Sequence, residues 1–95
     1  MLPEQRVSTH PGEILVEEFL KPMGVTQTTF AAHIGVAVQR VNEIVRGKRG
    51  ITAATAWLFA QALGTSPEVW MNLQVDYDLT AHRAVRQVPP LRPAA

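Results

Sequence analysis

Apolar residues recur every three or four positions in five separate stretches of the chain. This spacing is typical of helices that bury one face. No stretch alternates between apolar and polar residues as a half-buried strand does. The pattern predicts helices over residues 11–23, 26–34, about 36 or 37 to 46, 52–63, and 66 to near 84.

Residues with well-understood capping chemistry stand at the ends of these stretches. Side-chain oxygens that can accept from the first backbone N–H groups precede three of them, and glycine follows four of them. The sequence therefore predicts an all-α fold of short helices with tight connections. The expected N-cap residues are Thr26, Thr52 and Ser66, and the expected terminating glycines are Gly24, Gly35, Gly47 and Gly64.

The 95 residues are enough for one small domain. Residues 1–10 show no periodicity and include Pro3, so we expect an extended N-terminal arm. Residues 88–95 contain three prolines, which favours disorder. We therefore expect one domain over residues 11–84 and a Pro-rich, disordered tail over residues 85–95.

Composition narrows the class of protein further. Hydrophobic residues make up 46% of the chain, as a globular core requires. The chain has no cysteine, which excludes disulfides and thiolate metal sites. It has no apolar run near the roughly 18 residues of a spanning helix, and no signal-peptide pattern at its N-terminus. We expect a cytoplasmic protein that does not contact a membrane.

Charge is segregated along the chain, although the net charge is only +1. Residues 26–50 carry Arg40, Arg46, Lys48 and Arg49 against Glu43 as the single acid, whereas residues 51–80 carry only acids. A compact basic block suits a polyanion that docks on one face. Ordinary surface solvation explains the same block equally well.

The third predicted helix has two distinct faces when its residues are placed at about 100° per position. Its outer face carries amide and guanidinium groups, which match donors and acceptors on base edges. With a glycine-terminated helix before it and a basic loop after it, the segment predicts a helix-turn-helix that places this helix in a major groove. A solvated face of a helical bundle is the alternative. The inner face is Ala37, Val41, Ile44 and Val45, and the outer face is Gln39, Asn42, Glu43 and Arg46, with Arg40 on a flank.

Residues 25–52 read VTQTTFAAHIGVAVQRVNEIVRGKRGIT and resemble the Cro/C1-type helix-turn-helix. The longer stretch from His10 to Leu79 resembles the HigA-type antitoxins, also called VapI-like. Four motifs carry this resemblance: HPGE at 10–13, GKRGIT at 47–52, GTSP at 64–67 and DYDL at 76–79. The resemblance implies a five-helix, lambda-repressor-like DNA-binding domain with the helix-turn-helix at helices 2 and 3.

The resemblance also implies roles for individual residues in DNA binding. The positions that face the groove would read bases, and those at the helix ends and in the basic loop would contact phosphates. The implied base-reading residues are Val38, Gln39, Arg40, Asn42 and Glu43, and the implied phosphate contacts are Gln27, Arg46, Lys48 and Arg49.

Three positions depart from the family pattern. Ala37 stands where the recognition helix usually has a Ser or Thr cap, so about 1 kcal/mol of capping is missing. Val38 occupies a position that is often polar, where it either touches a thymine methyl group or packs. Glu43 would repel the nucleic acid unless it accepts from a cytosine amino group. These departures affect the expected operator sequence and leave the docking mode unchanged.

One helix-turn-helix contacts only a few base pairs. Useful affinity therefore needs two copies spaced about one helical turn, ~34 Å, on a near-palindromic site, so we expect a homodimer. The fifth helix is apolar enough to form the dimer surface, and packing inside the monomer is the alternative. The expected dimer residues are Trp70, Leu73, Tyr77 and Leu79.

These observations predict a repressor that binds double-stranded operator DNA and regulates its own operon. The resemblance implies that it also neutralises a HigB-like toxin, a ribosome-dependent mRNA-cleaving enzyme. Two alternatives remain open. One is a toxin-binding inhibitor with weak or no DNA binding, and the other is a solitary phage-like or host transcription regulator.

Enzyme chemistry is not expected. The serine and threonine residues lack the base and orienting partner that a nucleophile needs. His10, His33 and His82 are scattered, with no second ligand at metal-binding spacing. We therefore expect no catalytic site, no metal and no cofactor.

Overall fold

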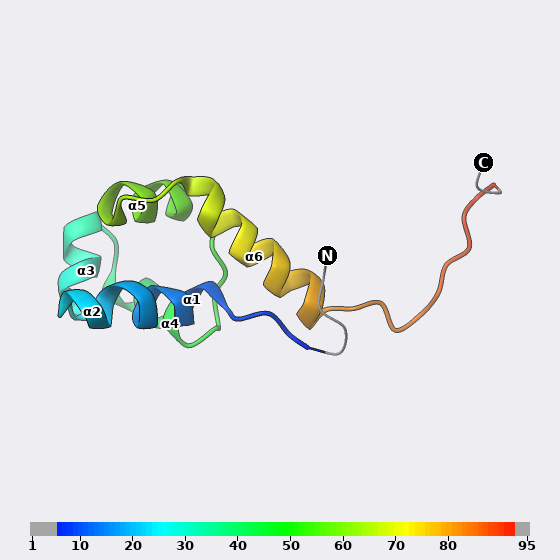
Figure 1. The fold of residues 1–95 in the computed structure, drawn as a ribbon, viewed down its shortest axis with the longest axis horizontal. Coiled ribbons are helices and arrows are strands. Elements are labelled where there is room, and N and C mark those ends of the chain that lie inside the picture. The colour runs from blue at the N-terminus through cyan, green and yellow to red at the C-terminus, as the bar shows by residue number, and fades with distance from the viewer. Residues whose placement is uncertain (1–5, 93–95) are drawn as a thin grey trace.

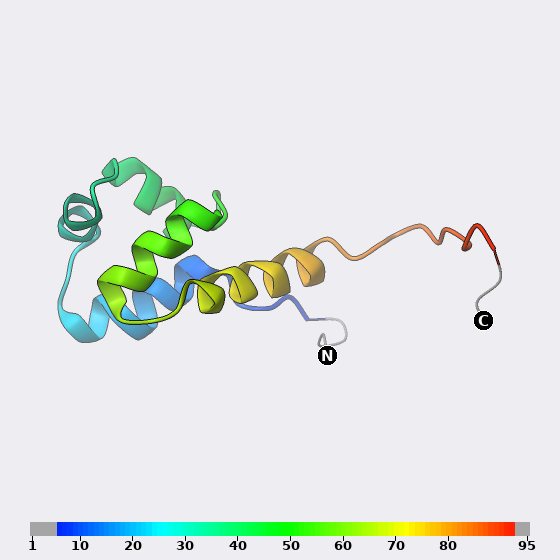
Figure 2. The same ribbon diagram turned by 90° about the horizontal axis from the view of Figure 1, so that it is seen from above.

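Helices are the regular elements between residues 6 and 92, the part of the chain that the computed structural model describes. Within this part there is no strand, so the predicted all-α fold is confirmed. Figures 1 and 2 show the helices gathered at one end of an elongated molecule. The elements are α1 (Pro11–Ile14), η1 (Leu15–Leu20), α2 (Lys21–Met23), α3 (Gln27–Ile34), α4 (Val38–Val45), α5 (Ala53–Leu63) and α6 (Pro67–Ala81).

The expected caps define three of the helix starts. The side chain of Thr26 accepts a hydrogen bond from Thr29 N at 3.0 Å. Thr52 and Ser66 cap α5 and α6 in the same way, each over 3.3 Å. Each of these side chains satisfies a backbone N–H that has no partner inside its helix.

The elements α1, η1 and α2 follow one another as one helix over residues 11–23, as predicted, but its middle is π-helical. Pro22 accounts for this irregularity. Its nitrogen cannot donate, and in a regular α-helix its ring would clash with the carbonyl of Glu18. The wider π turn, in which Lys21 N donates to Val16 O, gives the ring room.

The core lies where α5 and α6 pack over the N-terminal helix and α3. Phe59 and Trp70 are both fully buried, with ring centroids 5.1 Å apart at 90°. The ring of Phe30 also packs against Phe59, with centroids 5.3 Å apart at 68°. These edge-on contacts are the geometry that aromatic rings prefer. The remaining buried members of the cluster are Leu15, Leu20, Ala31, Val41, Ile44, Ile51 and Ala56.

The helix α6 reaches beyond the rest of the bundle, and residues 83–92 lead away from it in extended form (Figure 1). It ends at Ala81, three residues before the predicted end, and residues 83–92 form no helix. The N-terminal arm runs beside the end of α6, where Ser8 N donates to Thr80 Oγ1 at 2.8 Å. Residues 1–5 of the predicted arm and 93–95 of the predicted tail lie outside the described residues.

Candidate nucleic-acid interface

The helix α4 has one apolar and one polar face. Val41 and Ile44 are completely buried against the core, whereas Gln39 and Arg40 are exposed. Asn42 is half-buried and still reaches the surface. Burial of the inner face therefore orients the helix so that its amide and guanidinium groups point outward. This is the arrangement that a helix needs in order to present side chains to base edges.

The N-terminus of α4 lacks a side-chain cap, as the sequence predicts. Ala37 is the N-cap residue and has the extended backbone (φ −63°, ψ 139°) typical of that position. Its methyl group cannot accept a hydrogen bond, so only its backbone carbonyl is used, by Arg40 N at 3.0 Å. Ala37 precedes the first residue of the helix, and its side chain is exposed. Beside it, Val38 is 39% exposed and adds an apolar spot to the outer surface.

The turn between α3 and α4 closes around Gly35. Its φ of 76° is in the left-handed region that favours glycine. Val36 N and Gly35 N both donate to Ala31 O, at 3.1 and 2.9 Å, so the carbonyls at the end of α3 are satisfied. Gln27 is the first residue of α3 and is half-buried at the opposite end of this helix.

Gly12 lets the N-terminal helix approach the backbone of α4 closely. A Cβ atom at this position would lie 1.9 Å from the carbonyl oxygen of Ile44. Only a residue without a side chain permits this contact. The buried pair formed by Gly12 and Ile44 thus helps to fix the depth at which α4 sits in the fold.

The loop after α4 is a tight C-terminal turn built on Gly47, whose φ is 75°. Gly47 N donates to Ile44 O at 3.0 Å and Lys48 N donates to Glu43 O at 2.9 Å, which is the Schellman pattern. Arg49 N adds a second hydrogen bond to Glu43 O at 3.2 Å. Arg46, Lys48 and Arg49 are all exposed on and beside this turn. The turn therefore holds the predicted phosphate-binding residues next to α4.

Two of the predicted DNA-contacting residues contact each other. Arg49 Nε donates to Glu43 Oε1 at 2.9 Å, with 50% of the arginine side chain and 30% of the glutamate side chain exposed. Sequence reasoning treated Glu43 as an isolated acid and missed this pair. No local sequence pattern predicts this ion pair, because Glu43 belongs to α4 and Arg49 to the loop after it.

Gln74 of α6 connects the end of the same loop to the core, a role that no motif in the sequence indicates. Its Oε1 accepts from Ile51 N at 2.7 Å in a buried hydrogen bond, and its Nε2 donates to Asp78 Oδ1 at 2.8 Å. Gly50 lies so close that a Cβ there would be 3.0 Å from the amide carbon. The loop and α6 are thus joined by one satisfied amide.

His10 is the N-cap residue of the first helix, where its Nδ1 accepts from Gly12 N at 2.9 Å. Its ring meets Tyr77 edge-on at 4.6 Å and also lies against Gly47. Burial lowers the pKa of His10 below its usual 6.5, and the carboxylate of Asp78 offsets part of that shift. One neutral imidazole therefore joins the first helix, α6 and the turn after α4.

The structure changes the predicted dimer surface at one residue. Trp70 is 0% exposed, packs against Phe59 and donates from Nε1 to Thr65 Oγ1 at 2.8 Å. Its assignment to a dimer surface is wrong, because a side chain buried within one chain cannot touch another. Leu73 and Tyr77 are half-buried and Leu79 is 52% exposed, which leaves all three able to meet a partner. The helix α6 also exposes Val69 and Val75.

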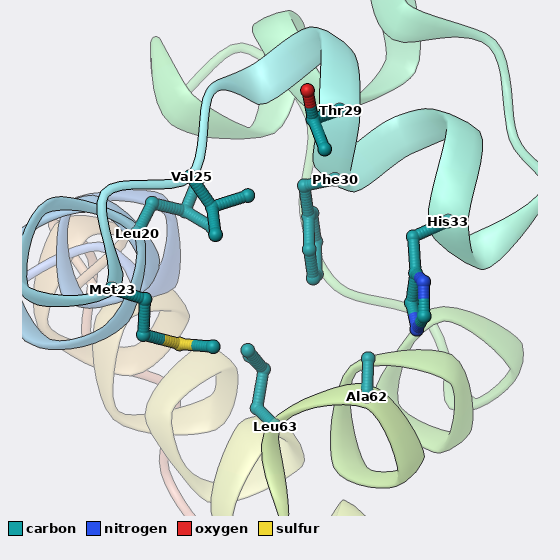
Figure 3. A pocket seen from close by; sticks show the side chains of 8 residues that line it. All are labelled: Leu20, Met23, Val25, Thr29, Phe30, His33, Ala62 and Leu63. Carbon is teal, nitrogen blue, oxygen red and sulfur yellow. The ribbon is translucent and has the colours of Figure 1, made fainter.

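An apolar pocket of about 290 Å³ lies between the N-terminal helix, α3 and α5 (Figure 3). Thr29 and His33 are the polar residues among its lining side chains. The pocket includes no residue of α4 or of the basic loop, so it is separate from the candidate interface. Within residues 6–92, no three His, Cys, Asp or Glu side chains group in a way that could hold a metal ion.

Comparison with known proteins identifies the family. A family model described as helix-turn-helix matches residues 16–70, which include α3, α4 and the loop after them. The chain belongs to this helix-turn-helix family. The family is a class of DNA-binding regulators, not of enzymes. None of the helices of this helix-turn-helix protein within residues 6–92 is long and apolar enough to cross a membrane.

Relatives of this helix-turn-helix protein agree with the predicted resemblance to HigA and VapI. The chain is 50% identical over 70 residues to virulence-associated protein I of Dichelobacter nodosus, a match covering 74% of this chain and 65% of that protein. It is 43% identical over 68 residues to antitoxin HigA-1 of Vibrio cholerae, covering 72% and 64%. The chain thus spans slightly less than two thirds of the length of each.

A solved structure shares the fold over nearly its whole length. It is described as Pseudomonas aeruginosa antitoxin HigA with the higBA promoter. The two chains are 39% identical, with a TM-score of 0.80, over 88% of this helix-turn-helix protein and 98% of that one. The five-helix arrangement predicted from the resemblance is therefore confirmed.

Proposed function

We propose that the chain is a sequence-specific DNA-binding repressor and the antitoxin of a HigBA-type module. The observation that carries this proposal is the outer face of α4, where exposed Gln39 and Arg40 stand over the buried Val41 and Ile44. Amide and guanidinium groups on such a face form paired hydrogen bonds with adenine and guanine edges. The likeness to an antitoxin solved with its promoter supports the same conclusion.

The basic turn supplies the sequence-independent part of the binding. Arg46, Lys48 and Arg49 are exposed beside the C-terminus of α4. When α4 lies in the major groove, these residues are close to the phosphates of the DNA backbone. Gln27, at the start of α3, adds a phosphate contact from the positioning helix. Release of counterions from these phosphates makes the affinity fall as salt rises.

Two copies act together on a near-palindromic operator of the chain's own operon. The exposed apolar side chains of α6, among them Val75 and Leu79, are the surface on which a second copy packs. We place this homodimer in the cytoplasm, where it meets both the operator and a HigB-like toxin that it neutralises.

The test is a binding titration with duplex DNA from upstream of the gene, at several salt concentrations. We expect a complex of two chains per palindrome and an affinity that falls steeply with salt. An Arg40→Ala/Arg49→Ala double variant should lose operator binding. Binding that is unchanged in this variant would contradict the proposed docking mode.

Two alternatives predict different results. The uncapped Ala37 favours a toxin-binding inhibitor whose helix-turn-helix no longer binds DNA, and that protein would co-purify with the toxin but shift no duplex. A solitary regulator would bind DNA but have no toxin gene beside its own. A short basic reading frame of about ninety residues next to the gene, whose product co-purifies with this chain, would support the antitoxin.

A further inference from the structure

We infer that Glu43 is a positioning residue for DNA binding, which holds the Arg49 guanidinium ready for a phosphate. This inference rests on the proposed function, because it needs a DNA-binding surface. It assigns to Glu43 a role opposite to the repulsion that its charge alone implies.

The backbone brings the two residues together first. Glu43 lies in the last turn of α4, and its carbonyl accepts from both Lys48 N at 2.9 Å and Arg49 N at 3.2 Å. With Gly47 in the left-handed conformation, this turn returns the chain toward the helix. The fold of the turn therefore places the side chains of Arg49 and Glu43 next to each other, independently of any contact between the side chains.

The side-chain contact leaves most of the guanidinium unused. Of its five N–H groups, the one on Nε donates to Glu43 Oε1 at 2.9 Å, and this contact does not use the four on the two Nη atoms. Half of the arginine side chain is exposed. The guanidinium is thus held by one edge, while the edge that forms paired hydrogen bonds with phosphate oxygens stays available.

An ion pair this exposed adds little to folding stability, because water and salt screen it. Its effect lies in the order that it imposes on a long side chain. A free arginine loses rotamer freedom when it binds a phosphate, whereas Arg49 has already lost part of that freedom in the unbound protein. Lys48, the neighbouring cation, is exposed and forms no such ion pair with any of residues 6–92. Its ammonium group is a point charge on a flexible stem, which is not held in place in this way.

The two roles for Glu43 predict opposite signs for one substitution. If Glu43 only repels the nucleic acid, Glu43→Ala removes a negative charge from the interface and tightens binding. If Glu43 positions Arg49, the same change frees the guanidinium and weakens binding. We expect binding to weaken by about threefold to tenfold, the range that corresponds to ordering one long side chain.

The experiment measures fluorescence anisotropy of a 30-base-pair duplex that the unaltered protein selects from a random pool, and of a scrambled duplex. Glu43→Ala should weaken binding to both, because a phosphate contact carries no sequence information. Glu43→Gln keeps an oxygen that accepts from Nε, so it should bind within about twofold of the unaltered protein. In an Arg49→Ala background, Glu43→Ala should cause no further loss.

Glu17→Ala is the matched control, because it removes the acid of the exposed Lys21 pair on the N-terminal helix. It changes the net charge equally but lies outside α4 and its loop, so its affinity should stay unchanged. Thermal unfolding of each variant shows that it remains folded.

Three outcomes overturn the inference. The first is that Glu43→Ala binds the duplexes as tightly as the unaltered protein, or more tightly. The second is that Glu43→Ala still weakens binding in the Arg49→Ala background. The third is that Glu43→Gln weakens binding as much as Glu43→Ala does. Failure of the unaltered protein to bind any duplex would instead overturn the proposed function.

Discussion

Gln74 of α6 accepts a buried hydrogen bond from the backbone N–H of Ile51 at 2.7 Å, and this contact anchors the basic loop to the core. Gln74→Met keeps the length of the side chain but removes the acceptor. An unsatisfied buried N–H costs about 1–3 kcal/mol, so we expect the free energy of unfolding in urea to fall by that amount. Asn72→Met, on the exposed side of the same helix, should change it by less than about 0.5 kcal/mol. Equal stabilities for the two variants would show that the anchor contributes nothing.

His10 makes the fold sensitive to acid. Its pKa is lowered in the folded protein by burial, so protonation favours the unfolded chain, whose histidine titrates near 6.5. The contribution of His10 is fully present above pH 6.5 and is lost as the pH falls through the lower folded-state pKa. Protonation of Nδ1 also removes the acceptor that caps the first helix. We expect the unfolding free energy to fall with acid in this window.

Two variants isolate this effect from other titrating groups. His10→Asn keeps a capping oxygen without titrating in this range, so its stability should depend less on pH between 7 and 5. His33→Asn changes an exposed histidine and should retain the pH dependence of the unaltered protein. Urea unfolding at a series of pH values tests this, and an unaltered slope in His10→Asn would contradict it.

Gly12→Ala reverses the usual preference for alanine in helices. In an open helix this change is worth up to about 1 kcal/mol in favour of alanine. Here the new Cβ would lie 1.9 Å from the carbonyl oxygen of Ile44, so the first helix must move away from α4. We expect a loss of about 1–3 kcal/mol, measured by thermal or urea unfolding. Glu18→Ala, at an exposed position inside the same helix, should change the free energy of unfolding by less than about 0.5 kcal/mol. A stabilised Gly12→Ala variant would be inconsistent with the close contact.

Ala37→Ser should stabilise the protein. The backbone at Ala37 is extended, as it is at the capped positions Thr26, Thr52 and Ser66. A serine side-chain oxygen at position 37 can therefore accept a hydrogen bond from a backbone N–H in the first turn of α4 without any rearrangement of the backbone. A cap of this kind contributes about 1 kcal/mol. The expected rise in the unfolding free energy is measurable by urea titration, and its absence would mean that the serine does not take up the capping rotamer.

Local signals in the sequence were sufficient to predict the helices. Thr26, Thr52 and Ser66 accept the expected backbone hydrogen bonds, and Gly35 and Gly64 end their helices in the left-handed conformation. The resemblance to the family, which usually has Ser or Thr at this position, predicted that Ala37 leaves α4 uncapped, and the structure agrees because no side chain caps this helix. Capping and turn preferences depend on residues only a few positions apart, so they can be predicted from the sequence without knowledge of the tertiary structure.

The features that sequence reasoning missed depend on contacts that form only once the chain has folded. Gln74 and Ile51 are 23 positions apart, and the Glu43 and Arg49 pair requires the turn at Gly47. Helical spacing placed Trp70 on an apolar face but could not show whether that face meets the core or another chain. The structure shows that it meets the core, because Phe19 and Phe59 of other helices pack against Trp70.

Base reading by the outer face of α4 is tested by the ratio of the affinities for a selected and a scrambled duplex. Gln39→Ala/Asn42→Ala removes two amides without changing charge, so we expect this ratio to fall by at least about tenfold while the salt dependence stays the same. The matched double variant Gln61→Ala/Asn72→Ala, which removes two exposed amides from α5 and α6, should keep the ratio. A ratio that is unchanged in the Gln39→Ala/Asn42→Ala protein would contradict base reading by α4.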